Sequence, residues 1–277
     1  MTIAIHMKVN DGMVLATDSA STIMAQDQSG NIGVVNIYNN ANKLFNIHKQ
    51  LPIGLITWGA GSIGGASTST LIKDFRDILT CDPTKKIDIN NYSIKNICDM
   101  FVDFIYKEKY IEEFKTWPQK PDVGFVIAGY STNQEMAEEW LIEINNGVCA
   151  GPVLRRAKEE TGMSWYGQPE AITRLYKGYG TLLPNVFVNS GIVPSDKIED
   201  LMKLVSANCE LPLTHPAMPI QDAIELAEFL VDLTEKYSKY APGPQTVGGP
   251  IEIACITKHE GFKWIKRKHY FDDSINR

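Results

Sequence analysis

A β-hairpin pattern begins at the second residue of the chain and constrains the fold more than any other feature. Residues 2–9 (TIAIHMKV) and 12–19 (GMVLATDS) are both strand-like, and the NDG sequence between them is a strong hairpin signal. Most chains begin with a few poorly ordered residues before their first element. Because a strand follows Thr2 at once here, we expect the chain to enter a sheet from its second residue.

The rest of the chain alternates pairs of strand-like runs with helical runs. After a polar excursion at 23–42, strand pairs are predicted at 43–47 with 53–58, 122–131 with 137–145, and 250–257 with 261–268. Helical periodicity is found at 64–79, 93–114, 169–179, 196–207 and 221–240. No repeat or linker divides this order. It predicts one α+β domain over 1–277, with two antiparallel sheets and helices on their outer faces.

Charge and cysteine content indicate which classes of partner to expect and which cellular compartment the protein occupies. A formal charge of -6 over 277 residues gives no basic surface, so we expect no nucleic-acid partner. Five scattered cysteines indicate reduced thiols in a cytoplasmic protein. Neither they nor the five histidines show a paired metal spacing, so no metal and no cofactor is expected, and His6, inside a strand pattern, is interpreted as structural.

The uncharged run at 50–72 is long enough to span a membrane but is rich in glycine and hydroxyl residues. We interpret it as a buried strand leading into a glycine turn and a helix, and expect no membrane partner. Its Gly59-x-Gly-x-x-Gly64 pattern also fits dinucleotide binding. The acidic-tipped strand expected after such a helix is missing, so we favour a second role, in which the Gly59 N–H binds an oxyanion.

Thr2 is a candidate nucleophile. Methionine aminopeptidase removes Met1 when the second residue is small, and Thr2 would then carry a free α-amine. That amine titrates near neutral pH and is the base that a weak threonine hydroxyl needs. Since Thr is also a common second residue, this pattern alone does not establish catalysis.

Asp18 and Lys43 are candidates to support Thr2. A hairpin around NDG returns Asp18 to the neighbourhood of Thr2, and Lys43 begins the next strand. An ammonium there would stabilise the Thr2 alkoxide and keep the α-amine unprotonated, with Asp18 holding the lysine. The alternative is an ion pair at the ends of two strands that contributes little.

These residues together resemble a family. Thr2, the strand pair ending in LATDSAS, Lys43 in KLF-x-I, the turn at Gly59 and the closing GGPIEIACITKHEGF resemble proteasome β-subunits, the HslV peptidase and the proteasome-like Anbu proteins. The resemblance is clear over 2–80 and weak between 145 and 245, a region that is enlarged here. It implies a four-layer αββα N-terminal nucleophile hydrolase fold. Its implied catalytic residues are Thr2, Asp18, Lys43, Gly59 and Tyr166.

Two motifs depart from the family pattern. Tyr166 in WYGQP stands where active proteasome subunits have a serine, and Pro244 and Val247 in GPQTVGG replace a supporting Asp and Ser. Both patterns are more similar to Anbu than to archaeal or eukaryotic subunits. The departures affect the surroundings of the α-amine and therefore the strength of proteolysis.

The resemblance implies a threonine peptidase acting on peptides or unfolded proteins in a homo-oligomer, either a ring or a spiral. Whether an ATPase partner exists stays open. Two alternatives remain: an inactive structural subunit of a proteasome-like assembly, and a small-molecule acylase on the same fold. In the family, helices like those at 66–114 and 221–240 supply contacts between subunits. Met100, Phe101, Phe104 and Ile105 then form either part of such a contact or part of the chain's own core.

Overall fold

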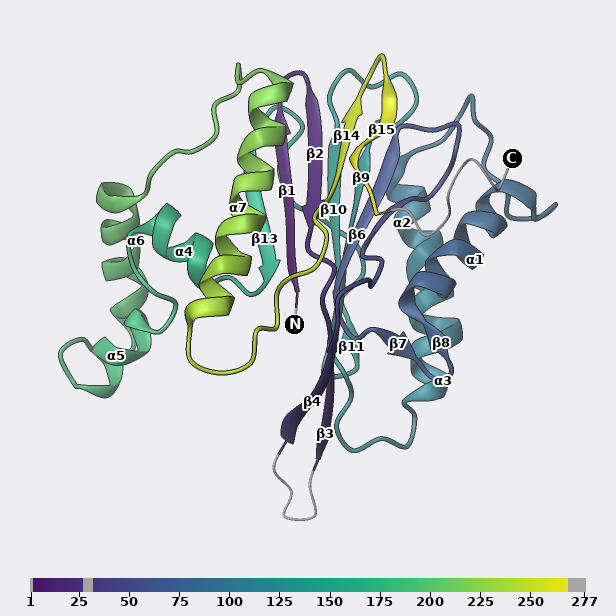
Figure 1. The fold of residues 1–277 in the computed structure, drawn as a ribbon. Helices are drawn as coiled ribbons and strands as arrows, with labels where there is room; N and C mark the ends of the chain where they lie inside the picture. Colours follow the sequence, from purple (N-terminus) through teal and green to yellow (C-terminus); the bar gives the residue numbers. More distant parts are fainter. Residues whose placement is uncertain (1, 27–31, 269–277) are drawn as a thin grey trace.

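A computed structural model describes residues 2–26 and 32–268. Met1, and with it the expected removal of this residue, lies outside the described residues, as does His269. Two antiparallel sheets stack face to face in the middle of the molecule (Figure 1). The first sheet has five strands, in the order β13 (Gly162–Gly167), β1 (Ile3–Val9), β2 (Gly12–Thr17), β14 (Glu252–Thr257) and β15 (Gly261–Lys266).

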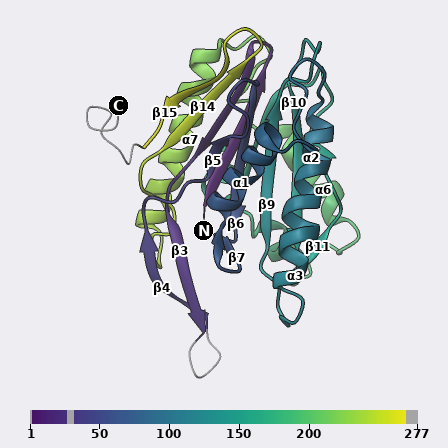
Figure 2. The same ribbon diagram turned by 90° about the vertical axis from the view of Figure 1, so that its right-hand side faces the viewer.

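The second sheet has six strands and lies beside the first (Figure 2). Its order is β11 (Val148–Cys149), β10 (Glu138–Asn145), β9 (Val123–Gly129), β6 (Ile53–Gly59) and β5 (Leu44–Asn46), with β12 (Val153–Leu154) also paired to β10. Four further strands form two small antiparallel pairs outside these sheets. They are β3 (Ser21–Gln26) with β4 (Ile32–Tyr38), and β7 (Ser62–Ile63) with β8 (Ala66–Ser67).

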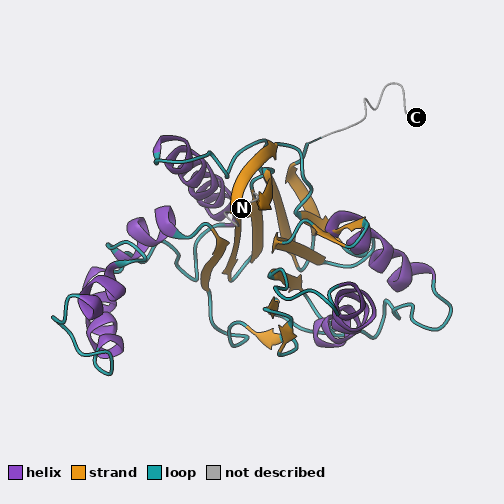
Figure 3. Ribbon diagram, turned by 90° about the horizontal axis from the view of Figure 1, so that it is seen from below, coloured by secondary structure: helices purple, strands orange, loops and turns teal. Residues whose placement is uncertain are grey.

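Helices cover the outer face of each sheet. The first sheet is covered by α7 (Ile220–Tyr240) and α4 (Glu170–Lys177), and the second by α1 (Thr68–Cys81), α2 (Ile94–Val102), the π-helical segment η1 (Asp103–Tyr110) and α3 (Ile111–Glu113). The two other helices in the described part of the chain, α5 (Leu183–Asn189) and α6 (Ile198–Cys209), project from the body (Figure 3). This arrangement confirms the predicted αββα layers.

The alternation of side chains along β1 explains why both of its faces are buried. Ile3 and Ile5 pack with Leu230 of α7, whereas Ala4 belongs to the apolar layer between the sheets. Because β1 lies between β13 and β2, its backbone is also paired on both edges. The first strand of the chain is therefore a central one, and Thr2 directly precedes it.

The predicted strand pairs and long helices are present, and the structure also contains elements that were not predicted. The polar excursion contains the β3–β4 hairpin, and neither β13 nor α5 was expected. The candidate contact stripe on the second helical run belongs to the chain's own core, because Phe101, Phe104 and Ile105 are buried against the second sheet and Met100 packs beside them. The three buried residues are therefore unsuited to a contact between subunits.

A buried ionic network joins the two sheets at the middle of β1. His6 Nδ1 lies 3.1 Å from Glu139 Oε2, and Arg156 contacts the other carboxylate oxygen. Arg156 Nη2 also donates to Ser164 Oγ at 2.7 Å. Burial raises the pKa of Glu139, but His6 and Arg156 outweigh it and hold the pKa at about 2. His6 is therefore part of this interior network.

Acid should weaken the fold through Glu139. Its pKa lies below the usual 4.5 in the folded state, so its contribution is present above pH ~4.5 and is lost as the pH falls toward about 2. Glu139→Gln should lower the free energy of unfolding at pH 7 by roughly 3–5 kcal/mol, as removal of one buried partner does. Urea unfolding at pH 7 and pH 3 measures this difference, which should shrink at pH 3.

The matched control is Glu135→Gln, which removes an exposed partner of Lys258. This variant should unfold like the wild type at both pH values, because surface pairs contribute little. A pH-independent effect of Glu139→Gln would contradict the assignment of the stabilisation to the charged carboxylate.

Candidate functional site

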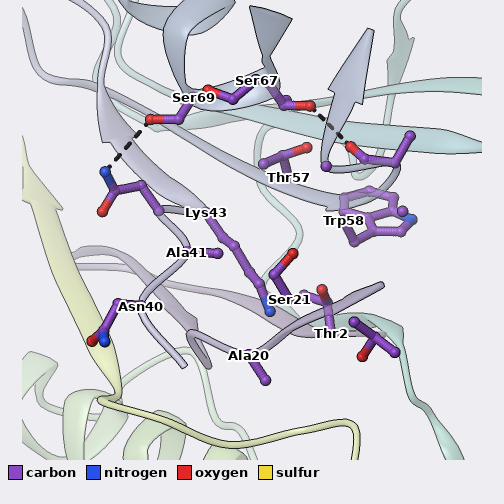
Figure 4. Close-up of a pocket in the computed structure, with 16 residues that line it drawn as sticks. Thr2, Ala20, Ser21, Asn40, Ala41, Lys43, Thr57, Trp58, Ser67 and Ser69 are labelled. Carbon is purple, nitrogen blue, oxygen red and sulfur yellow. Dashed lines mark hydrogen bonds between the residues drawn. The ribbon is translucent and has the colours of Figure 1, made fainter. Parts of the chain in front are cut away.

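A pocket of about 380 Å³ opens at the end of the sheets where β1 begins (Figure 4). Its walls come from segments far apart in the sequence: the residue before β1, the start of β3, the segment before β5, the end of β6 and the start of α1. Residues from these segments include Thr2, Ser21, Lys43, Trp58, Gly59 and Ser69. Three of the residues singled out from the sequence, Thr2, Lys43 and Gly59, thus share one pocket.

The backbone of Thr2 is held on the side of β13. Gln168 N donates to Thr2 O at 2.8 Å, and Gly167 pairs with Ile3. Gly167 has φ +94°, and a Cβ built there would lie 2.0 Å from Thr2 O. Only glycine permits this approach. Thr2 is therefore fixed at the end of a paired strand and is only 5% exposed.

Asp18 is fully buried and its carboxylate is held on both oxygens. Oδ1 accepts from Ile3 N at 3.0 Å and from Lys43 Nζ at 2.7 Å. Oδ2 accepts from Ala20 N at 3.1 Å and from Gly248 N at 3.2 Å. Asp18 therefore connects the strand that follows Thr2 to Lys43, and it does so from behind the pocket.

Lys43 directs its side chain toward Thr2 and Ser21 (Figure 4). Its side chain is 7% exposed and forms a buried ion pair with Asp18. Burial lowers the pKa of Lys43, and the attraction of Asp18 opposes this shift. The pair is thus a buried one, unlike the weak surface pair that the sequence left as an alternative. Its ammonium supplies positive potential beside Thr2.

Gly59 ends β6 in a conformation that favours glycine. It has φ +88°, and a Cβ there would lie 2.4 Å from Asp122 O. Ala60 N donates to the same carbonyl at 2.9 Å, which fixes the turn. Gly59 forms part of the pocket wall, and its role with an oxyanion remains a prediction.

The glycine pattern that starts at Gly59 does not lead directly into a helix. The β7–β8 hairpin comes between them, and α1 begins at Thr68 with Ser67 as its N-cap. A dinucleotide site needs the glycine turn to open the helix itself, because the pyrophosphate binds at that helix N-terminus. The local structure therefore differs from a dinucleotide-binding turn, and Gly59 does not stand at the start of α1.

Tyr166 lies beside the pocket without being part of its lining. It pairs with Ala4 across β1 and β13, and its ring stacks on Trp58 with 4.1 Å between centroids. Its hydroxyl lies 3.5 Å from His6 Nε2, between the sheets. Of the two other departures from the family pattern, Val247 is buried directly before Gly248, and Pro244 lines a separate small hollow with Gln168.

Three contributors to the site were missed from the sequence. Trp58 forms one wall, Gly167 fixes Thr2, and Gly248 donates to Asp18. The strand preceding Gly59 and the late Gly-Gly pair were the available signals for two of them. The signal for Gly167 was its place directly after Tyr166 in WYGQP, although β13 itself was not predicted.

No protein-family model matches the chain, and no curated protein is similar to it in sequence. Solved structures are similar in fold. The Anbu complex from Pseudomonas aeruginosa, described as a helical assembly, has a TM-score of 0.53 at 13% identity, covering 98% of this chain and 88% of that one. An Anbu (Gly-1) mutant from a Hyphomicrobium species has a TM-score of 0.50 at 14% identity, covering 99% and 88%. The resemblance to Anbu is thus confirmed at the level of the fold.

The described residues add two further observations. None of their helices is long and apolar enough to cross a membrane. Within the same residues, no three His, Cys, Asp or Glu side chains come together in a way that could hold a metal ion. All five cysteines are free.

Proposed function

We propose that the chain is a threonine-type amide hydrolase of the proteasome family, in which Thr2 acts through its own α-amine. The observation that supports this most is the meeting of Thr2, Lys43 and Gly59 in one pocket, with Asp18 buried behind Lys43. The shared Anbu fold agrees with it. Removal of Met1 is a condition of the proposal, because only then is the nitrogen of Thr2 a free amine.

The proposed reaction has two halves. The α-amine of Thr2 takes the hydroxyl proton, directly or through a water, and Oγ attacks the amide carbonyl carbon. The tetrahedral oxyanion faces the Gly59 N–H, while the Lys43 ammonium stabilises the developing negative charge. The ammonium formed on Thr2 returns its proton to the leaving amine, which leaves an ester on Oγ. A water activated by the same amine then hydrolyses the ester and releases the acid.

Two features bear on the range of substrates. Most polar side chains around the pocket are uncharged, among them Ser21, Thr57, Ser67 and Ser69, and Lys43, the lysine of its described lining, is paired with Asp18. A charged substrate side chain would lose its hydration there without gaining a free counter-charge. Small neutral residues before the cleaved bond should be preferred over Asp, Glu, Lys or Arg by about tenfold or more in kcat/KM. A panel of fluorogenic peptides varied at that position measures the ratio.

The same panel, extended to simple acyl-amides, separates a peptidase from a small-molecule acylase. Cleavage of acyl-amides alone would favour the acylase. Equal rates for charged and neutral peptides would contradict the substrate preference without touching the chemistry of Thr2.

A peptide epoxyketone tests the proposed chemistry directly, because it reacts with both the amine and the hydroxyl of an N-terminal threonine. Intact mass should show a chain lacking Met1 and carrying one inhibitor, and peptide mapping should place the inhibitor on Thr2. A processed chain that stays unlabelled and hydrolyses nothing would favour the inactive structural subunit. Tyr166 is the observation in favour of that alternative. It stands where active proteasome subunits have a serine, but its ring stacks on Trp58 and its hydroxyl faces His6.

The proposal includes a homo-oligomer, either a closed ring or an open spiral. The Pseudomonas aeruginosa relative in fold is described as a helical assembly, which supports the spiral. Confinement of Thr2 in such a particle would limit its substrates to peptides and unfolded chains. Light scattering should report a particle far larger than the 30.9 kDa chain at micromolar concentration. A monomer would contradict the proposed oligomer but not the proposed chemistry of Thr2.

A further inference from the structure

A second buried ion pair lies next to Asp18 and Lys43. Lys268, two residues beyond the end of β15, has a side chain that is only 5% exposed, and Glu252 at the start of β14 is 2% exposed. The Lys268 ammonium lies 2.6 Å from Glu252 Oε2. Buried lysines are rare unless all of their charge and donors are matched. The burial of Lys268 and Glu252 therefore needs another explanation than that of an ordinary surface ion pair.

The other two contacts of Lys268 reach the segments that hold the candidate site. Its Nζ donates to Ser19 Oγ at 2.7 Å and to Ala41 O at 2.8 Å. Ser19 directly follows Asp18, and Ala41 lies two residues before Lys43. With Glu252 these are three acceptors for the three donors of an ammonium. One side chain from the end of the described chain thus joins both segments.

The two segments also contact each other at the same place. Ala41 N donates to Ser19 O at 2.9 Å, Ser19 N donates to Gly248 O at 2.9 Å, and Ser19 Oγ donates to Pro250 O at 2.6 Å. Ser19 Oγ therefore accepts from Lys268 while its own proton is already used. Loss of the ammonium would leave this junction without its central donor and would leave Glu252 buried without its charge partner.

Lys268 also contributes to the electrostatic surroundings of Lys43. Burial lowers the pKa of Lys43, Asp18 opposes the shift, and the Lys268 charge lowers the pKa further while Glu252 raises it. Around the two ion pairs, Arg267 lowers the pKa of the adjoining Lys268, and Asp18 raises the pKa of Glu235 on α7. Lys268 therefore acts on Lys43 by position and by charge.

We propose that Lys268, paired with Glu252, is a positioning residue that fixes the segments bearing Asp18 and Lys43 against each other. The proposal rests on the proposed function, since the geometry it maintains is that of the Thr2 site. It does not involve contact with substrate, because Lys268 lies outside the described lining of the pocket.

Lys268→Met in the full chain tests the proposal. We expect kcat for the best peptide substrate to fall roughly tenfold to a hundredfold, because displacement of catalytic groups by about 1 Å has effects of this size. KM should stay within about twofold. The control is Lys266→Met, at the position two residues before Lys268. It removes an exposed ion pair with Glu228 and should leave both kcat and KM unchanged. A folded Lys268→Met protein with the wild-type kcat overturns the proposal.

The double variant Glu252→Gln with Lys268→Met covers the case in which the single variant does not fold. It has no unpaired buried charge, so it should regain the thermal stability of the wild type. Its kcat should remain low, since the ties to Ser19 and Ala41 are still missing. A double variant that regains kcat together with stability shows a merely structural pair and overturns the proposal.

A readout independent of turnover separates this proposal from the proposed function. With ¹³C-labelled lysine, the Lys43 signal can be assigned through Lys43→Arg and followed by NMR during a pH titration. Lys43 should titrate at higher pH in Lys268→Met than in the wild type, because a neighbouring positive charge is gone, and Lys266→Met should match the wild type. A shifted Lys43 in a protein that hydrolyses nothing supports the coupling of Lys268 to Lys43 while the proposed function fails. An unshifted Lys43 overturns that coupling and the role proposed for Lys268.

Discussion

The Thr2→Ala protein should hydrolyse no amide above the uncatalysed background while folding and assembling like the wild type. The substitution removes Oγ together with the Cγ2 methyl group, and no other residue of the proposed mechanism can replace Oγ. Loss of a nucleophile lowers kcat on the order of a millionfold in a well-studied hydrolase, so activity should fall below detection. The backbone contacts from Gln168 and Gly167 to Thr2 O do not involve the side chain and should persist.

Hydrolysis of the preferred peptide and the melting temperature should be measured together. Thr2→Ser retains a hydroxyl and an amine and should keep part of the activity. Thr80→Ala, an exposed threonine on α1, is the matched control and should be fully active. Wild-type turnover in a homogeneous Thr2→Ala preparation would remove the whole mechanism.

Lys43→Ala should lower kcat by about a hundred- to a thousandfold, the range of roughly 2.7–4 kcal/mol found for loss of a preorganised group at a developing charge. Lys43→Arg should fail as well, since a planar guanidinium does not replace a compact ammonium in a buried pair. An Arg variant with full activity would show that Lys43 contributes no more than positive charge.

Stability must be followed separately for this position. Lys43→Ala leaves the Asp18 carboxylate buried with its three backbone donors but without its counter-charge. The free energy of unfolding should fall by roughly 3–5 kcal/mol. Asp18→Asn should reduce kcat less than Lys43→Ala, because the amine of Lys43 is still present. Lys95→Ala, which breaks an exposed pair with Asp99, controls for loss of a lysine in general.

Much of the fold could be predicted because its strands come in pairs joined by short turns. The NDG hairpin alone fixes the antiparallel pairing of β1 with β2 and returns Asp18 to Ile3, whose N–H it accepts. Hydrophobic periodicity then locates α7 and the helices over the second sheet. Local patterns of this kind depend on residues close in sequence, and so they can be recognised without knowledge of the tertiary structure.

The parts that were missed depend on contacts between distant segments. β13 has the sequence GMSWYG, with glycine at both ends and a mixture of polar and aromatic residues, and it becomes a strand by pairing with β1. The orientation of Tyr166 follows from that pairing, which turns its ring toward Trp58. Lys268 is another case, since a lysine beyond the last strand looks exposed until Glu252, Ser19 and Ala41 are seen around it.

The central position of β1 sets an order of events during synthesis. Thr2 is 5% exposed once β1 is paired on both edges, so the proposed function would require an aminopeptidase to act before the sheet closes. The residues of β13 leave the ribosome roughly 10 to 30 s after those of β1 at the usual rates of translation. Until then one edge of β1 has no strand to pair with. On the proposed function, removal of Met1 would therefore compete with closure of the sheet on the nascent chain, and protein refolded with Met1 still attached would remain inactive.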